Sequence, residues 1–433
     1  RRSGSARSSR HRSRTTMSKT VLFGAIGRHN FGDLLFAHIV ERMIRDSGIE
    51  TDIHFCDLLA RDMTPYDGHD VESITSFLDI DDLNIVHIGG QTGGCSVEAA
   101  LKMLEDPATK SGFGIRAQEY IAFALKNIHR RIRYIRRFLP IDLIRERLFA
   151  ARLSSFGISP LSSVEVAYLL PKALFRAPGI FVANSIGGNS KPALQNLASY
   201  DYVGFRDRQS YLIARDHGIE NLHLAPDCAV LTRYLFEELI VGRSSREAIR
   251  KMRAAVGKDY VAIQINTSIL DAHGREIEEA LSEFINRTSL PLVFFCAGIA
   301  PQHDSAEQYR ARFMNGLEQG KIYFFDSYNI WDICHVISNA TLIVGTSLHV
   351  RIIASLYERK RLTLCGDHKQ NSYIDEWDFS KEKTQPERLY DDAVRILSAP
   401  HDETGDRENT LALERLYLEM NFLNMGLWAD GKG

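Results

Sequence analysis

The sequence predicts an α/β protein made of two doubly wound domains, each with a mostly parallel sheet covered by helices on both faces. Short apolar runs alternate with stretches of helical periodicity through most of the chain. The runs are apolar on both faces, which is typical of parallel strands buried between helices. A charged helical stretch at residues 233–258 interrupts this alternation, and a second α/β series follows it.

The first series of apolar runs predicts an N-terminal domain over residues 17–232. Each run is short and ends in glycine or in polar turn residues, so that strand, loop and helix follow one another repeatedly. The expected strands are residues 20–26, 52–58, 84–90, 179–186, 202–206 and 222–225.

The second series predicts a C-terminal domain over residues 259–398, joined to the first by a linker helix at 233–258. Its expected strands are residues 260–266, 291–298, 321–326, 340–346 and 361–366. Leucines at helical spacing then predict a C-terminal helix and tail over 399–433 that packs back on the body.

Composition narrows the class of protein. Of the 433 residues, 44% are hydrophobic and 25% charged, which excludes a largely disordered chain. The sequence contains no run of 18 apolar residues, so no membrane-spanning helix is expected. Residues 1–16 contain six arginines and no acid, and are interpreted as a disordered basic arm or an expression extension. Without them the chain has 47 basic and 55 acidic residues, so no nucleic-acid partner is expected.

The six cysteines are scattered and do not have the spacing of metal-binding motifs. They predict reduced thiols and a cytoplasmic location.

Residues 111–175 do not fit the alternation and predict a helical insertion. Between Lys126 and Arg152 there are nine basic residues and two acids, with isoleucines at helical spacing. The favoured interpretation is a solvated insertion that packs on the sheet. The alternative is a peripheral contact of 126–152 with an anionic membrane surface.

Three glycine-bearing loops follow predicted strands of the first domain: residues 24–33, 89–94 and 183–188. The carboxyl ends of parallel strands meet at one rim of a sheet, where ligands of open α/β folds bind. Glycines allow the backbone to approach a ligand closely. The polar loop residues Asn30, Asp33, Gln91, Thr92 and Asn184 are therefore candidates for holding a substrate.

Arg206 ends the predicted strand 202–206 and can present its planar guanidinium to a carboxylate or phosphate. Asp207 beside it can orient that guanidinium or cap the following helix, and a local surface ion pair is the alternative. Asp227 follows the next strand and is interpreted as a turn residue.

The segment Thr346-Ser347-Leu348-His349-Val350-Arg351 follows a predicted strand of the second domain. Thr346 or Ser347 can cap the next helix, which places His349 in the first turn, where free amides favour an anion. Arg351 lies one turn after Ser347.

Other polar residues near strand ends are assigned loop or capping roles: Gln264, Asn266, His303, Tyr328 and Asn329. The sequence has no paired aspartate ladder, HExxH or GxSxG motif. We therefore expect no metal, and no covalent catalysis by serine or cysteine.

These loops, in this order, resemble the polysaccharide pyruvyl transferase family. The matching pieces are GAIGRHNFGD from Gly24, IGGQTGG, NSIGG, FRDRQS followed by PDCAVL, and GTSLHVRIIA. The resemblance implies two Rossmann-like domains in a GT-B-like arrangement with an interdomain cleft. It also implies pyruvate transfer from phosphoenolpyruvate, a co-substrate with no further cofactor, to paired hydroxyls of a saccharide. The product is a cyclic ketal, made in exopolysaccharide or cell-surface glycan biosynthesis.

By motif the resemblance implies catalytic roles for Arg206 and His349, with Asp207 beside them. The family arginine that stands two residues before this histidine is Ser347 here, and Arg351 is expected to reach the same space from the next turn. The donor site would then comprise Arg206, Thr346, Ser347, Leu348, His349 and Arg351.

Two other functions remain open from the sequence. One is a GT-B glycosyltransferase that uses a nucleotide sugar, because a fold does not determine a function. The other is a non-catalytic glycan-assembly protein, which the serine at 347 favours. A lipid-linked acceptor would suit a protein held at the inner face of the membrane through 126–152.

Overall fold

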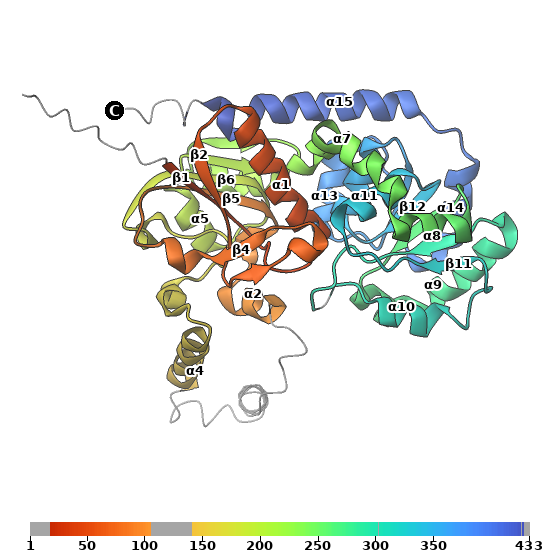
Figure 1. Ribbon diagram of the computed structural model, residues 1–433, viewed down its shortest axis with the longest axis horizontal. Helices are drawn as coiled ribbons and strands as arrows, with labels where there is room; N and C mark the ends of the chain where they lie inside the picture. Colours follow the sequence, from red (N-terminus) through yellow and green to blue (C-terminus); the bar gives the residue numbers. More distant parts are fainter. Residues whose placement is uncertain (1–17, 105–140, 302, 426, 428–433) are drawn as a thin grey trace, which may run out of the picture.

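The computed structural model describes residues 18–104, 141–301, 303–425 and 427, and these form two α/β domains side by side (Figure 1). Each domain has one sheet with helices on both faces. The long helix α15 (Glu403–Met420) lies along both domains on one side of the molecule. The predicted fold class is confirmed.

The first sheet has the strand order β3-β4-β2-β1-β5-β6-β7-β8, and its neighbours are parallel except β3 and β4. The order reverses beside β1, whose Phe23 lies between Cys56 of β2 and His87 of β5. Its strands are β1 (Ser18–Phe23), β2 (Thr51–Asp57), β3 (Arg61–Asp62), β4 (Asp70–Ser73), β5 (Asp81–Gly90), β6 (Ala177–Ile186), β7 (Tyr202–Phe205) and β8 (Leu222–Leu224).

Helices cover this sheet on both faces: α1 (Phe31–Asp46), α2 (Val97–Leu104), α5 (Lys191–Leu197) and α6 (Arg208–Asp216). Helix α4 (Ile141–Ser155) extends away from the sheet (Figure 1), and among its residues 146–155 only Leu153 is buried. The end of the predicted insertion is part of the domain, because Leu161, Tyr168 and Leu170 are buried in the core that contains α2. Of the basic stretch 126–152, residues 126–140 lie outside the described part, and the rest is in α4. None of the described helices is both long and apolar enough to cross a membrane.

The second sheet has the order β11-β10-β9-β12-β13-β14, with all neighbouring strands parallel. Its strands are β9 (Val261–Gln264), β10 (Leu292–Phe294), β11 (Ile322–Phe324), β12 (Leu342–Gly345), β13 (Lys360–Leu364) and β14 (Lys383–Thr384). The covering helices are α9 (Thr267–Thr288), α10 (Ala306–Phe313), α11 (Ile330–Ser338), α12 (Leu348–Leu356), α13 (His368–Trp377) and α14 (Leu389–Ser398).

Two helices, α7 (Thr232–Gly242) and α8 (Glu247–Val256), connect the sheets between β8 and β9. They are fixed to the second domain, since Arg243 Nε donates to Asp332 Oδ1 at 2.7 Å and Arg253 Nη2 donates to Asn339 Oδ1 at 2.8 Å. At the other end, α15 returns to the first domain, where Tyr417 donates to Asn184 Oδ1 at 2.9 Å. The chain therefore crosses between the domains twice.

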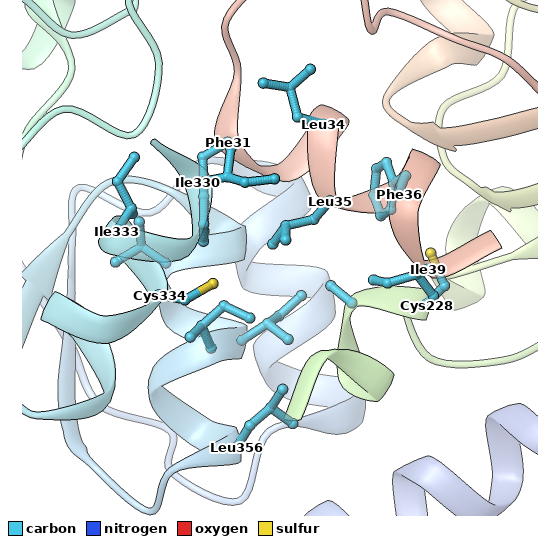
Figure 2. Close-up of a cluster of buried hydrophobic side chains, with 14 of the residues drawn as sticks. Phe31, Leu34, Leu35, Phe36, Ile39, Cys228, Ile330, Ile333, Cys334 and Leu356 are labelled. Atoms are coloured by element: carbon cyan, nitrogen blue, oxygen red, sulfur yellow. The ribbon is translucent and has the colours of Figure 1, made fainter. Parts of the chain in front are cut away.

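The domains share one apolar core around α1 (Figure 2). Phe31, Leu35 and Ile39 of α1 are buried in the same cluster as Ile333 of α11 and Leu356 of α12. Domains move freely only where their interface is small or polar. This interface is apolar and continuous with the cores on both sides, which holds α1 firmly against the second domain.

All eleven predicted strands are present, with ends shifted by a few residues. Three short strands at or next to a sheet edge were not predicted: β3, β4 and β14. They are two to four residues long and mostly polar, so they lack the continuous apolar run on which the prediction depended.

A buried histidine gives the first domain a pH-dependent stability. His87 Nδ1 donates to the carbonyl of Val182 at 3.1 Å, and Nε2 accepts the N–H of Leu170 at 3.2 Å. Burial lowers the pKa of His87 to about 3, despite the bond to Val182, so the ring is neutral in the folded protein.

The unfolded chain binds a proton at His87 below about pH 6.5, and the folded chain does not. The free energy of unfolding of the wild type should therefore fall, relative to His87→Gln, as pH drops from about 6.5 toward 3. The slope should approach about 1.4 kcal/mol per pH unit. Urea titrations of both proteins at several pH values measure it, and parallel stability curves would contradict the assignment.

Candidate active site at the domain interface

The predicted loops of both domains meet where the carboxyl ends of the two sheets face each other. The first strand order reverses at β1 and β5, and the second reverses at β9 and β12. Ligands of open α/β sheets bind at such switch points. Residues 28–33 and 89–94 follow the first pair of strands, and Thr346 to His349 follow β12.

Asp227 connects the two predicted catalytic residues. Its Oδ2 accepts a hydrogen bond from Arg206 Nη1 at 2.5 Å and lies 3.6 Å from His349 Nε2. Its Oδ1 accepts the backbone N–H of Ala229 at 3.0 Å. Burial alone would raise the pKa of this fully buried carboxyl, but Arg206 and His349 outweigh it and lower that pKa to about 2. Asp227 is therefore an anion that holds both side chains.

His349 reaches this point from the second domain by lying on the helix α1 of the first. A Cβ atom on Gly32 would overlap the His349 ring, so glycine is required for this approach. Phe36, one turn further along α1, contacts the ring edge-on at 5.0 Å between centroids. His349 Nε2 is buried without a hydrogen-bond partner, and it faces Asp227.

The N-terminus of α12 beside His349 has no side-chain cap. Ser347 occupies the N-cap position, but its hydroxyl accepts no bond from the helix. The Thr346 hydroxyl accepts the N–H of Asn266 at 2.9 Å and does not cap either. The first-turn N–H groups of α12 are thus left for solvent or an anion. Ser347 therefore leaves this end of the helix uncapped.

Arg28 is a second cation near the site. It lies in the loop GAIGRHNFGD, but it was not predicted to be a site residue. Its Nη2 pairs with Asp33 Oδ2 at 3.1 Å, and its Nη1 lies 3.2 Å from His303 Nε2 of the second domain. Burial, then the Arg28 charge, lowers the pKa of His303 to about 4, so His303 is a neutral acceptor. Arg28 Nε is buried without a partner.

The loop around Arg28 is bonded directly to the second domain. Phe31 N–H donates to the carbonyl of Ala297 at 2.7 Å, and His29 Nε2 bonds the carbonyl of Tyr328 at 2.7 Å. Asp304 supports this contact by accepting the N–H groups of Ala297 at 2.6 Å and Gly298 at 3.3 Å. Burial raises the pKa of Asp304 to about 7, although these bonds oppose the rise.

The glycine loops of β5 and β6 lie on the other side of Arg206. A Cβ on Gly187 would come within 3.0 Å of both Gln91 Oε1 and Asp207 Oδ2, and within 3.6 Å of Arg206 Nε. Asp207 itself caps α6 by accepting the N–H of Ser210 at 2.7 Å. The structure thus brings together Arg206, Asp207, Gln91 and His349, as expected for residues of one site.

Of the remaining loop candidates, Asn30 and Asn184 have structural partners and the Thr92 hydroxyl has none. Asn30 caps α1, accepting the N–H of Gly32 at 3.2 Å, and Asn184 accepts from Tyr417. The Thr92 hydroxyl and Asn184 Nδ2 are buried without a partner. Asn266 and Asn329 cap α9 and α11, in agreement with their predicted capping roles.

The prediction that Arg351 takes part in the donor site is wrong. Its guanidinium is buried in a separate network, where Nε donates to Asp378 Oδ2 at 2.6 Å and Nη1 donates to Thr363 Oγ1 at 2.9 Å. Its Nη2 donates to the carbonyl of Ser380 at 2.5 Å. Residues 349 and 351 are two positions apart on one helix, which is a rotation of about 200° around its axis. The Arg351 side chain therefore points away from the side of the helix that His349 occupies.

The structure also changes the interpretation of Asp227. The residue was interpreted as a turn-former because an aspartate after Pro226 is common in turns. It does cap the turn that follows, but it is also fully buried between Arg206 and His349. Its place in the PDCAVL piece, directly after a predicted strand, was the signal in the sequence that could have indicated this role.

Comparison with solved structures shows the same two-domain GT-B fold. The UDP-N-acetylglucosamine 2-epimerase of Rickettsia bellii aligns with a TM-score of 0.51 and 12% identity, over 95% of this chain and 98% of that one. The UDP-GlcNAc 2-epimerase of Methanocaldococcus jannaschii, with bound UDP-GlcNAc and UDP, aligns with a TM-score of 0.49 and 14% identity, over 92% and 100%. No curated protein sequence matches the chain.

A model of the polysaccharide pyruvyl transferase family matches residues 30–362, a span that includes Gly32, Arg206, Asp227 and His349. Arg28 lies just before that span. The match covers most of the chain and both domains, and with the shared fold it identifies the protein class. The chain belongs to the polysaccharide pyruvyl transferase family.

Proposed function

We propose that this protein transfers pyruvate from phosphoenolpyruvate to two neighbouring hydroxyls of a saccharide, forming a cyclic ketal. The observation that carries the proposal is the convergence of Arg206 and His349, from different domains, on the buried carboxylate of Asp227. This arrangement provides a fixed cation and a basic ring beside an open helix N-terminus.

The donor has two anionic groups, a carboxylate and a phosphate, and the site has two arginines to meet them. Each arginine is compensated by one aspartate, Arg206 by Asp227 and Arg28 by Asp33. Among the described residues, Asp227 is the one hydrogen-bond partner of the Arg206 guanidinium. Both arginines thus keep N–H groups for an anion, together with the first-turn amides of α12.

His349 is the proposed proton carrier. The carboxylate of Asp227 lies 3.6 Å from Nε2 of this imidazole, and a buried carboxylate beside a catalytic histidine is a recurring arrangement in enzymes. A proton delivered to the methylene carbon of phosphoenolpyruvate makes an oxocarbenium-like centre at the neighbouring carbon. The oxygen of one saccharide hydroxyl bonds to that carbon. The bond between that carbon and the bridging oxygen of the phosphate breaks. The oxygen of the second hydroxyl then bonds to the same carbon and closes the ketal ring. Of the two hydroxyl protons released, one replaces the proton given to carbon and the other leaves with phosphate.

The acceptor is proposed to lie along the glycine loops of the first domain. Gln91 is exposed there, and the Thr92 hydroxyl and Asn184 Nδ2 are polar groups without partners. The Gln91 side chain packs on the glycines at 187 and 188, and this close approach keeps its amide, which can bond to hydroxyls, at the edge of the loops. The acceptor sugar and any lipid carrier on it belong to this proposal.

Activity is tested directly with phosphoenolpyruvate and a panel of glycosides. We expect phosphate release coupled to the gain of one pyruvyl group on the acceptor, observed by mass spectrometry. His349→Gln should lower the rate by about 10²–10⁴-fold, because it removes the proton carrier. His217→Ala, which removes an exposed imidazole on α6, is the control.

The same proteins distinguish a different donor. If no acceptor gains pyruvate, and a nucleoside diphosphate raises the melting temperature while phosphoenolpyruvate does not, the enzyme is a nucleotide-sugar transferase. If neither donor binds by calorimetry, the glycan-assembly function gains support and the proposal fails.

Gly32 should be essential because His349 lies on it. Gly32→Ala places a methyl group in the imidazole ring and must displace it from Asp227. We expect transferase activity to fall by about 100-fold or more, as happens when a reacting group is misplaced by about 1 Å. Gly242→Ala is the matched control, since a Cβ there meets no atom within 4 Å. Full activity in Gly32→Ala would show that His349 is not the proton carrier.

Arg28 should contribute to donor affinity. Arg28→Ala removes a charge-assisted hydrogen bond, for which about 1.5–3 kcal/mol predicts a rise in the KM for phosphoenolpyruvate of about 10–150-fold. Arg42→Ala, on the helix that follows the Arg28 loop, is the control, because Arg42 pairs with Asp46 in solvent. Steady-state kinetics with both variants measure the effect. An unchanged KM for the donor would remove Arg28 from the site.

A further inference from the structure

Three side chains of the first domain that can bind a metal lie together beside α1. His38 and Glu41 are one turn apart on α1, and His69 comes from the loop that leads into β4. One ligand atom from each lies within 4.8 Å of the others. All three residues are partly buried, so the cluster is enclosed but can still be reached by a small ion.

The cluster is separate from the candidate active site. His38 is two residues after Phe36, which contacts His349, so the two side chains point about 200° apart around α1. His38 instead lies against Trp331 of the second domain, at 5.2 Å between ring centroids. The proposed reaction uses none of these three residues.

The ring of His38 is held in the way that metal-binding histidines usually are. Its Nε2 lies 2.6 Å from the backbone carbonyl of Asp67, to which it donates. The lone pair is therefore on Nδ1, and the ring cannot turn without losing that bond. A backbone carbonyl of this kind typically orients a histidine ligand and fixes its tautomer.

His69 has a buried nitrogen with no hydrogen-bond partner. Its ring stacks on Phe55 with centroids 3.5 Å apart and planes 9° apart, which fixes its orientation. Its Nε2 is buried and unpartnered, 3.9 Å from Glu41 Oε2, too far for a hydrogen bond.

Glu41 turns one oxygen toward His69 and uses the other in an ion pair. Arg45 donates to Glu41 Oε1 from Nε at 2.9 Å and from Nη2 at 2.7 Å. This bidentate contact orients the carboxylate and leaves Oε2 on the side of the histidines. A cation between the three side chains would satisfy the unpartnered His69 nitrogen and this oxygen together.

We propose that His38, Glu41 and His69 bind a divalent transition-metal ion of the Zn²⁺ type. Two imidazoles and one carboxylate form a ligand set that suits zinc, and three protein ligands leave a fourth position for water. The site rests only on these side chains and does not depend on the proposed transfer reaction.

The position of the site gives the metal a structural role at the domain interface. Asp67, whose carbonyl holds His38, accepts from Asn329 Nδ2 at 2.5 Å and pairs with Arg243 Nη1 at 3.3 Å. A metal that joins His69 to α1 would fix this loop next to its contacts with the second domain. Ligands that bind only the folded state raise its stability, so the bound ion should raise the melting temperature.

The full chain, without an affinity tag, is titrated with ZnCl₂ by calorimetry and with CoCl₂ by visible absorption. We expect saturable binding of one ion per chain and a tetrahedral Co²⁺ spectrum. His69→Phe, which keeps the stacking on Phe55, and Glu41→Gln, which keeps the side-chain shape, should each weaken binding by at least about 10-fold. The rise in melting temperature with Zn²⁺ should disappear in both.

His217→Ala is the control, because it removes an exposed histidine and should leave binding unchanged. Circular dichroism of each variant shows whether it is folded. If His69→Phe does not fold, the test relies on Glu41→Gln. The proposal is overturned if the wild type binds no ion saturably, or if binding in a folded Glu41→Gln or His69→Phe variant equals that of the wild type.

Discussion

The candidate site depends on one interaction, the pairing of a fully buried carboxylate with two side chains from different domains. Asp227 is removed from water, and an isolated charge in that position would be very costly. Arg206 neutralises it from the first domain and His349 approaches it from the second. Removing one partner of a buried pair costs about 3–5 kcal/mol, so this contact fixes the position of the two domains as well as the site.

Helix α1 makes that contact possible because it serves both domains. Its apolar side chains pack against α11 and α12 (Figure 2). Its glycine at 32 leaves room for the His349 ring. The loop that precedes it is bonded to residues 297–300 of the second domain. The same helix carries His38 and Glu41 on another face, so the proposed metal site would strengthen the element on which the active site is built.

The positively charged groups and the uncapped helix end of the candidate site come from both domains. Arg351 is not among them, because its guanidinium forms a separate buried network with Asp378. Arg28 approaches from the opposite domain, and the uncapped end of α12 adds backbone donors. The anion-binding capacity of the site is therefore distributed over both domains.

The sequence alone determined the two α/β domains, their main strands and the rim on which the loops gather. Each of these is encoded locally, by apolar runs of strand length that end in glycine. It also indicated Arg206 and His349, since both stand at strand ends in motifs of the family. The spacing of apolar residues did not predict the short polar strands β3, β4 and β14, because few of their side chains are buried.

Only the tertiary structure decided which charges meet. Asp227 has the sequence environment of a turn residue, and Arg28 that of a loop residue, until the domains bring them to His349 and His303. Arg351 was misassigned because distance along a helix does not determine direction. Contacts between residues more than a hundred positions apart depend on how two sheets and their helices pack, and no local pattern records that packing.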